Sequence, residues 1–187
     1  MIAGPNGSGK TTFYDRYLKG AFPIFVNADR IAADSTAPSP ESRNREAAEQ
    51  ADGARRRLMA EGRSFAMETV FSRTIYWLTF IEQAKANGYY VWLFFLCLET
   101  PELNMARVLS RVAQGGHPVP LEKVLKRWHG SLNTAALAIP LVDELWFYDN
   151  SVSNQEHRLV GTYLEGRPSL VTDPVPLWAK RFFGQRA

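Results

Sequence analysis

Short apolar runs alternate with longer amphipathic or polar stretches along most of the chain. The apolar runs have the length of β-strands and cover residues 22–27, 64–67, 90–98 and 143–148. The longer stretches have helical length and spacing and cover residues 11–18, 41–61, 72–87, 101–114 and 121–138. This alternation predicts an α/β fold with a parallel sheet and helices on both of its faces.

Only three residues, Met1 to Ala3, precede the first glycine and could form the first strand. A typical strand has about five residues, so either this strand is very short or the natural chain starts upstream of Met1. We favour the second interpretation as a hypothesis. Mass analysis of the endogenous protein that found Met1 as its first residue would contradict it.

Length and composition fit a single domain. The chain of 187 residues suits one α/β domain with a full-sized core over residues 1–187. Residues 150–187 are expected to be peripheral, with a short strand or helix near residues 158–165 and a tail interrupted by prolines. Hydrophobic residues make up 45% of the chain and charged residues 22%, which is ordinary for a globular protein.

Three features of the composition limit the classes of function. No apolar run approaches the roughly 20 residues that a membrane span needs, and no signal peptide is visible. The single cysteine, Cys97, lies in an apolar run and is expected to be a buried thiol, compatible with a reducing cytoplasm. The net charge of +3 is small, and the run Arg55–Arg57 is expected to be a solvated helix face. We therefore expect a cytoplasmic protein with no membrane or nucleic-acid partner.

The N-terminal segment contains the complete P-loop pattern G-x-x-x-x-G-K-[ST]. Its glycines can adopt positive φ, so that several backbone N–H groups converge on phosphate oxygens. Lys10 is expected to reach the β- and γ-phosphates of ATP or GTP, and Thr11 to ligate Mg²⁺. A helix that starts near Lys10 would direct its positive end at the same phosphates. The predicted nucleotide-binding residues are Gly4, Pro5, Asn6, Gly7, Ser8, Gly9, Lys10, Thr11 and Thr12.

Polar side chains also follow the second and third predicted strands. In an open α/β sheet, ligands bind at the carboxyl ends of the strands. Asp29 is expected to face the γ-phosphate, where it could accept or orient the proton of an acceptor hydroxyl; the alternative is that it caps a turn. Glu68 could order Mg²⁺ or hold the acceptor, or be a simple loop carboxylate. Thr69 and Ser72 either add hydroxyls to the acceptor site or cap the next helix.

Two basic helices follow in the second half of the chain. Arg107 and Arg111 are four residues apart, so they share one helix face, and Lys123 and Arg127 repeat this spacing on the next helix. The Gly-Gly-His sequence that ends at His117 separates the two helices, and Arg107 and His117 are candidate substrate-binding residues. The pattern fits a lid over residues 107–133 whose arginines stabilise a transferring phosphoryl group. It fits a solvated helical hairpin equally well, and spacing alone does not separate the two.

Three blocks of sequence resemble the zeta-toxin family of P-loop kinases, in particular its compact bacterial branch. They lie between residues 3 and 150 and comprise Ala3–Thr12, Val26–Ala32 followed by Glu68-Thr69 with Ser72, and Arg107–Pro120 with Arg127, Ser131 and Asn133. The resemblance implies a kinase-type P-loop core, with a parallel five-stranded sheet in the order 2-3-1-4-5. Toxins of this family phosphorylate the 3′-hydroxyl of the sugar in UDP-N-acetylglucosamine and thereby stop cell-wall synthesis.

The same resemblance assigns roles to individual residues. Asp29 would be the base that faces the acceptor hydroxyl, and Glu68 would hold the acceptor. Arg111 and Arg127 would be the lid arginines, although their separation of 16 residues differs from the spacing expected in the larger toxins. The chain is also shorter than those toxins and its sugar-nucleotide region is compressed. The resemblance therefore leaves UDP-sugar specificity and toxicity open.

Three hypotheses of function follow from these residues. The main one is an ATP- or GTP-dependent small-molecule kinase that uses Mg²⁺ and phosphorylates a hydroxyl, with UDP-N-acetylglucosamine as the candidate acceptor. The second is a toxin module whose partner is a small helical antitoxin. The third is a nucleotide-binding switch or ATPase that transfers phosphate only to water, against which the acceptor-side carboxylates and the lid argue.

Overall fold

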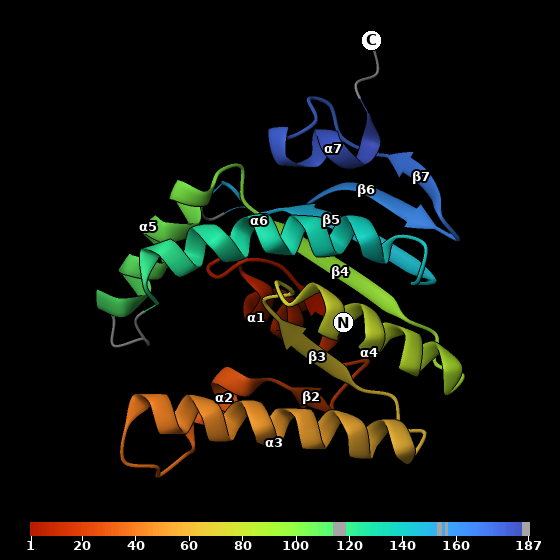
Figure 1. Cartoon of the computed structure of the whole chain (residues 1–187). Coiled ribbons are helices and arrows are strands. Elements are labelled where there is room, and N and C mark those ends of the chain that lie inside the picture. The colour runs from red at the N-terminus through yellow and green to blue at the C-terminus, as the bar shows by residue number, and fades with distance from the viewer. Residues whose placement is uncertain (114–118, 153–154, 156, 185–187) are drawn as a thin grey trace.

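The computed structural model describes residues 1–113, 119–152, 155 and 157–184. Its central element is a seven-stranded sheet in the order β2-β3-β1-β4-β5-β6-β7 (Figure 1). The strands are β1 Ile2–Ala3, β2 Phe25–Val26, β3 Ala66–Thr69, β4 Trp92–Cys97, β5 Glu144–Asp149, β6 Arg158–Leu164 and β7 Arg167–Leu170. The first five strands are parallel and have the predicted order 2-3-1-4-5.

The prediction of five strands is wrong, because two further strands extend the sheet beyond β5. β6 pairs antiparallel with β5, and β7 pairs antiparallel with β6. The two-residue turn between them, Glu165-Gly166, has positive φ at both positions, 50° and 75°. This is the backbone that a tight hairpin needs to match the twist of its strands. The segment near residues 158–165 is therefore a strand rather than a helix.

The helices lie close to their predicted positions. They are α1 Lys10–Phe13, which continues into a π-helical segment Tyr14–Leu18, α2 Ala28–Ala33, α3 Pro40–Ala60, α4 Thr74–Ala86, α5 Pro101–Ala113, α6 Leu121–Ala138 and α7 Lys180–Phe183, preceded by a 3₁₀ turn Leu177–Ala179. The short helix α2 was not predicted. It begins because Asn27 caps its first turn and accepts hydrogen bonds from the backbone N–H groups of Asp29 and Arg30.

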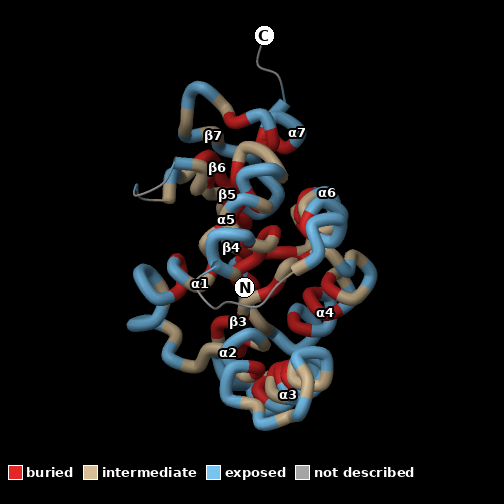
Figure 2. Tube along the Cα trace, turned by 90° about the vertical axis from the view of Figure 1, so that its left-hand side faces the viewer, coloured by how far each residue is buried: buried red, intermediate tan, exposed pale blue. Residues whose placement is uncertain are grey.

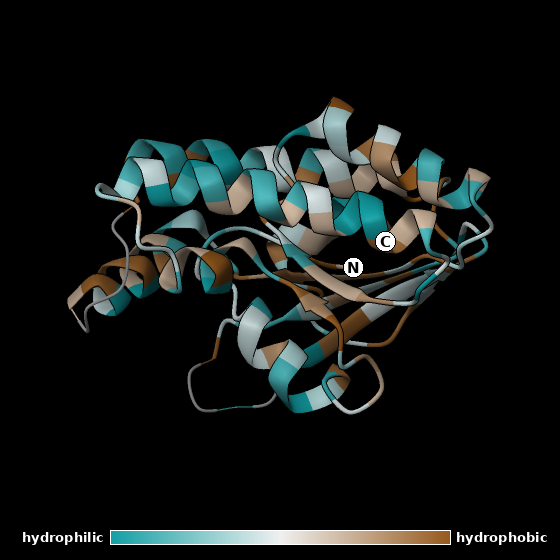
Figure 3. Ribbon diagram, turned by 90° about the horizontal axis from the view of Figure 1, so that it is seen from below, coloured by the Kyte–Doolittle hydropathy of each residue, from teal (hydrophilic) through white to brown (hydrophobic). Residues whose placement is uncertain are grey.

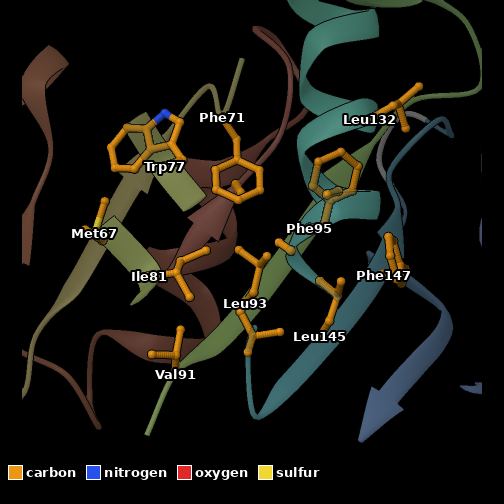
Figure 4. Close-up of a cluster of buried hydrophobic side chains, with 14 of the residues drawn as sticks. Met67, Phe71, Trp77, Ile81, Val91, Leu93, Phe95, Leu132, Leu145 and Phe147 are labelled. Carbon is orange, nitrogen blue, oxygen red and sulfur yellow. The ribbon is translucent and has the colours of Figure 1, made fainter. Parts of the chain in front are cut away.

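The sheet has α4 and α6 on one face and α1 on the other (Figures 1 and 2), and the buried hydrophobic side chains form two clusters. Apart from its first residue, Trp92, strand β4 is largely covered on both faces, so its side chains contribute alternately to the two clusters. Leu93, Phe95 and Cys97 join the larger cluster, while Phe94 and Leu96 pack with α1 on the other face. Figure 4 shows the larger cluster, in which side chains of β3, β4, β5, α4 and α6 meet.

The C-terminal segment, expected to be peripheral, contributes to this core. Trp178 and Phe182 are buried and pack on Phe147 of β5, with ring centroids 6.1 and 4.4 Å apart. The indole N–H of Trp178 also donates to the carboxylate of Asp149, at 2.8 Å. The segment lies at one edge of the sheet (Figure 1), but its aromatic side chains pack on those of β4 and β5.

The distribution of polarity agrees with this packing. The strands are largely hydrophobic, and hydrophilic residues gather on the outer surfaces of the helices (Figure 3). Cys97 is fully buried, as predicted. In the part of the chain that the structure describes, no helix is both long and apolar enough to cross a membrane.

Candidate active site

The P-loop connects β1 to α1 and has the backbone that its glycines predict. Gly4, Gly7 and Gly9 have φ angles of 144°, 81° and 90°. A Cβ atom at Gly4 would lie 2.0 Å from the carbonyl oxygen of Leu96, and one at Gly9 would lie 2.3 Å from Nδ2 of Asn150. At Gly4 only glycine allows the loop to lie so close to the backbone of β4, whereas at Gly9 the neighbour is a side chain and the positive φ is the reason for glycine.

Lys10 is buried at the start of α1, directly after the loop. Its ammonium group donates to the carbonyl oxygen of Pro5 at 3.0 Å and lies 3.8 Å from Oε1 of Glu68. Burial lowers the pKa of Lys10, the carboxylates of Glu68 and Asp29 oppose this, and the arginines Arg111 and Arg127 add to the lowering. Each of the two predicted carboxylates and the two predicted lid arginines is thus close enough to Lys10 to affect its pKa.

Glu68 is the centre of a hydrogen-bonded group at the carboxyl end of β3. Its Oε2 accepts from the hydroxyl of Thr11 at 2.7 Å and from Nδ2 of Asn27 at 2.8 Å. The pairing of β1 with β3, in which Ile2 lies opposite Glu68, brings this carboxylate to the P-loop. The two predicted metal ligands, Thr11 and Glu68, are therefore in direct contact.

Thr11 and Glu68 also fit a magnesium site in their chemistry. A hydroxyl and a carboxylate are hard oxygen donors, and proteins hold Mg²⁺ through one or two such groups together with substrate phosphates. Both donors lie where the lysine of the P-loop approaches the expected position of the phosphates. A bound Mg²⁺ would supply charge neutralisation for the phosphates at this point.

Asn27 contacts the predicted site, although it was not among the predicted site residues. Its side chain is buried, and both polar atoms of its amide form hydrogen bonds. Oδ1 caps α2, and Nδ2 donates to Glu68. The cap holds the first turn of α2, in which Asp29 is the second residue. The signal in the sequence was an Asn directly after an apolar run and two residues before Asp, which is a helix-start pattern.

A cleft of about 690 Å³ opens beside these groups. Four predicted site residues line it, namely Asp29, Glu68, Thr69 and Arg127. Further lining residues come from α3 and from the start of α4, and none of them was predicted as a site residue. These are Ala48, Glu49, Ala51, Asp52, Arg55, Arg56, Arg73, Tyr76 and Trp77.

Thr69 is the last residue of β3, and Ser72 lies between β3 and α4. The hydroxyl of Thr69 accepts a hydrogen bond from the backbone N–H of Phe71 at 2.9 Å, which supports the positive φ of 63° at that residue. Ser72 packs against Gly130 of α6, where a Cβ atom would lie 3.2 Å from that of Ser72. Thr69 lines the cleft, and Ser72 is not among the described residues that line it.

The basic helices α5 and α6 lie against the P-loop (Figure 1). Nη1 of Arg127 donates to Oδ1 of Asn6 at 3.2 Å. Nη2 of Arg107 donates to the carbonyl oxygen of Asn150 at 2.7 Å, and burial lowers the pKa of Arg107. Arg107 therefore lies on the side of the P-loop where Asn150 approaches Gly9, away from the lining of the cleft. His117 lies outside the described residues.

Two side chains that were not predicted as site residues also form hydrogen bonds with the P-loop. Nδ2 of Asn104 donates to the carbonyl oxygen of Asn6 at 2.6 Å, and Nδ2 of Asn150 donates to that of Ser8 at 3.0 Å. Both asparagines are far from the motif in sequence, so only the folded chain brings them to it.

The expectation of a solvated face for Arg55–Arg57 is wrong for the first of the three. Arg56 and Arg57 are exposed, but Arg55 is 7% exposed. The reason is helical geometry, because Arg55 follows Ala51 by four residues and precedes Leu58 by three, and both are buried.

Comparison with known proteins agrees with this architecture. The chain matches the family described as Zeta toxin over residues 1–140. An uncharacterized protein from Haemophilus influenzae is 30% identical over 128 residues, which cover 68% of this chain and 90% of that protein.

Two solved structures share the fold at low sequence identity. A chain of the AvrRxo1-ORF1:-ORF2 complex with ATP has a TM-score of 0.69 and 18% identity; the match covers 90% of this chain but only 59% of that one. A chain from the PezAT chromosomal toxin–antitoxin system of Streptococcus pneumoniae has a TM-score of 0.64 and 15% identity, covering 100% of this chain and 79% of that one. Since the Zeta toxin match includes the P-loop, Asp29, Glu68 and both basic helices, the chain belongs to the zeta toxin family.

Proposed function

We propose that this protein is a Mg²⁺-dependent kinase that transfers the γ-phosphoryl group of ATP or GTP to a hydroxyl of a small molecule. The observation that carries the proposal is the convergence of Lys10, Thr11, Asp29 and Glu68 at one end of the sheet, beside a cleft large enough for a small molecule. UDP-N-acetylglucosamine is the candidate acceptor because of the family to which the chain belongs.

The proposed reaction is an in-line displacement. Asp29 accepts the proton of the acceptor hydroxyl while the hydroxyl oxygen forms a bond to the γ-phosphorus. The bond between this phosphorus and the oxygen bridging to the β-phosphate breaks, and the nucleoside diphosphate leaves with that oxygen. Lys10, Arg111 and Arg127 neutralise the charge on the phosphates, and Glu68 orients the acceptor.

Replacement of Asp29 by Asn tests the role of the base. We expect Asp29→Asn to reduce turnover at least about 100-fold, which is the lower range for general-base catalysis, and to leave nucleotide affinity nearly unchanged. Turnover is measured as phosphorylated product by mass spectrometry, and affinity by calorimetry with a non-hydrolysable ATP analogue.

Asp34→Asn is the matched control, because Asp34 is an exposed residue that follows the same helix, and the substitution removes the same charge. Full turnover in the Asp29 variant would contradict the assigned role. Loss of nucleotide affinity together with turnover would also contradict it.

The acceptor is tested with the wild-type protein. ATP turnover is measured with and without UDP-N-acetylglucosamine, and then with a metabolite extract. A phosphorylated UDP-sugar would establish reaction and substrate together. Hydrolysis that no acceptor changes would instead favour the ATPase hypothesis.

A toxin module is the second candidate, favoured by the family match and by the fold shared with a chain from a toxin–antitoxin system. Growth arrest on expression, relieved by a small helical protein encoded beside it, would support this function. Harmless overexpression of a protein that is catalytically active would argue against it.

A further inference from the structure

The acceptor cleft contains a buried cation that the proposed phosphoryl transfer does not use. Arg55, on α3, is 7% exposed and lines the cleft together with Asp29 and Glu68. Its Nε atom is buried and has no hydrogen-bond partner among the described residues. Because buried polar groups are nearly always paired, an unpaired guanidinium N–H in a cleft points to a missing acceptor.

The neighbours of Arg55 do not complete its hydrogen bonding. Nη2 forms an ion pair with Oδ1 of Asp52 at 3.4 Å and lies equally far from the hydroxyl of Tyr76, and both distances are at the outer limit for a hydrogen bond. Asp52 is engaged elsewhere, since it accepts from the hydroxyl of Tyr76 and, at 2.9 Å, from Nε of Arg56. Below the guanidinium lies the ring of Trp77, whose centroid is 5.3 Å from its central carbon.

A second arginine lines the same cleft from the start of α4. Arg73 is exposed, and its guanidinium carbon lies 4.6 Å from the ring centroid of Tyr76. Tyr76 thus stands in contact with both arginines. The cleft is therefore lined by carboxylates from α2, β3 and α3, namely Asp29, Glu68, Glu49 and Asp52, and by arginines from α3, α4 and α6, of which Arg55 and Arg73 lie against aromatic rings.

We propose that Arg55, assisted by Arg73, binds an oxyanion of the acceptor molecule, a phosphate or a carboxylate group. Guanidinium groups pair with such anions through two parallel N–H···O bonds, and a pair in a buried setting is stronger than one on the surface. The acceptor is then an anion that also carries the reacting hydroxyl, and neutral sugars are excluded. This assignment rests on the proposed function only in that the acceptor occupies this cleft.

The test measures binding and needs no turnover. The P-loop is first saturated with Mg²⁺ and a non-hydrolysable ATP analogue, so that an added anion cannot bind there. Inorganic pyrophosphate is then titrated in a calorimeter, and malonate in a second series. We expect pyrophosphate or malonate to bind, and the stronger of the two identifies the group as phosphate or carboxylate.

Variants then locate the site. Arg55→Gln is expected to weaken this binding about tenfold or more, as for loss of a charged hydrogen bond, and Arg55→Lys to weaken it less. Arg57→Gln is the matched control, because Arg57 is exposed on the same helix and is not among the residues lining the cleft. Arg73→Gln provides a second variant at an exposed position, should Arg55→Gln fail to fold in a thermal unfolding assay.

Absence of binding by both anions to the nucleotide-filled wild-type protein would overturn the inference. Equal affinity in the wild type, Arg55→Gln and Arg73→Gln would also overturn it. The outcome is distinct from that of the proposed function: anion binding together with ATP hydrolysis that no acceptor of the metabolite extract changes contradicts the kinase and keeps the site. Turnover that depends on Asp29 but occurs without anion binding supports the kinase and contradicts the anion site.

Discussion

At the scale of single residues, Lys10 illustrates how the site is prepared for phosphate. Burial lowers its pKa, and Arg111 and Arg127 add to this effect, while Glu68 and Asp29 oppose it. A bound polyphosphate adds negative charge beside the ammonium and so favours its protonated form. Because the folded protein lowers this pKa below its unfolded value, Lys10 disfavours folding below that lowered pKa, and the penalty disappears as the pH rises toward the unfolded value near 10.4.

Cys97 gives a prediction at the same scale. The thiol is fully buried in the core, and burial raises its pKa, so the reactive thiolate is scarce in the folded protein. We expect almost no reaction with a thiol reagent such as DTNB at neutral pH. After unfolding in guanidinium chloride, the single cysteine should react with one equivalent. Rapid labelling of the folded protein would contradict this burial.

Local motifs could be predicted from the sequence, whereas partners distant in sequence could not. The P-loop is encoded in eight consecutive residues, and its positive φ angles follow from its glycines. By contrast, the burial of Arg55 depends on which side of α3 packs inward, and the neighbouring arginines give no sign of it. The contacts of Asn104 and Asn150 with the P-loop span 98 and 142 residues, so no spacing rule reveals them.

At the scale of elements, the short helix α2 links secondary structure to the proposed chemistry. Asn27 caps α2 and contacts Glu68, so one side chain fixes both the helix that carries Asp29 and the carboxylate that contacts Thr11. The orientation of the acceptor-side groups therefore depends on how this helix begins.

Two substitutions at Asn27 separate these roles. Asn27→Ala should lower stability by about 1 kcal/mol through loss of the cap and should also reduce kcat. Asn27→Ser can still cap the helix but is too short to reach Glu68, so we expect near-normal stability with reduced kcat. Chemical denaturation and steady-state kinetics measure the two quantities. A serine variant with the kcat of the wild type would show that the contact with Glu68 does not position the site.

The elements themselves were predicted unequally. Long amphipathic helices and the continuous apolar strand β4 have clear patterns, and α3 and α4 agree with their predicted ranges to within about two residues. The sequence left β6 open as a strand or a helix and did not predict β7, because β7, Arg167–Leu170, is short and mostly exposed and so lacks an apolar pattern. Its existence depends on pairing with β6, which is a tertiary contact.

At the scale of the whole molecule, the C-terminal segment is part of the folded core. Trp178 is buried against Phe147 and Phe95 and donates a hydrogen bond to Asp149. The substitution Trp178→Ala should therefore lower the free energy of unfolding by about 3–5 kcal/mol. Urea denaturation followed by circular dichroism measures this change.

Leu177→Ala is the control for this prediction, since Leu177 is the adjacent residue and its side chain is 65% exposed. We expect its effect to stay within about 0.5 kcal/mol. A similar stability of both variants would contradict the structural role of the C-terminal segment.

The end of β5 connects the C-terminal segment with the P-loop. Asp149 holds Trp178 of the C-terminal segment, and the next residue, Asn150, donates to the P-loop at Ser8. Thermodynamic reciprocity requires that, if nucleotide binding favours docking of the C-terminal segment through this connection, docking of the segment raises nucleotide affinity by the same factor. Displacement of the C-terminal segment would then lower nucleotide affinity as well as stability.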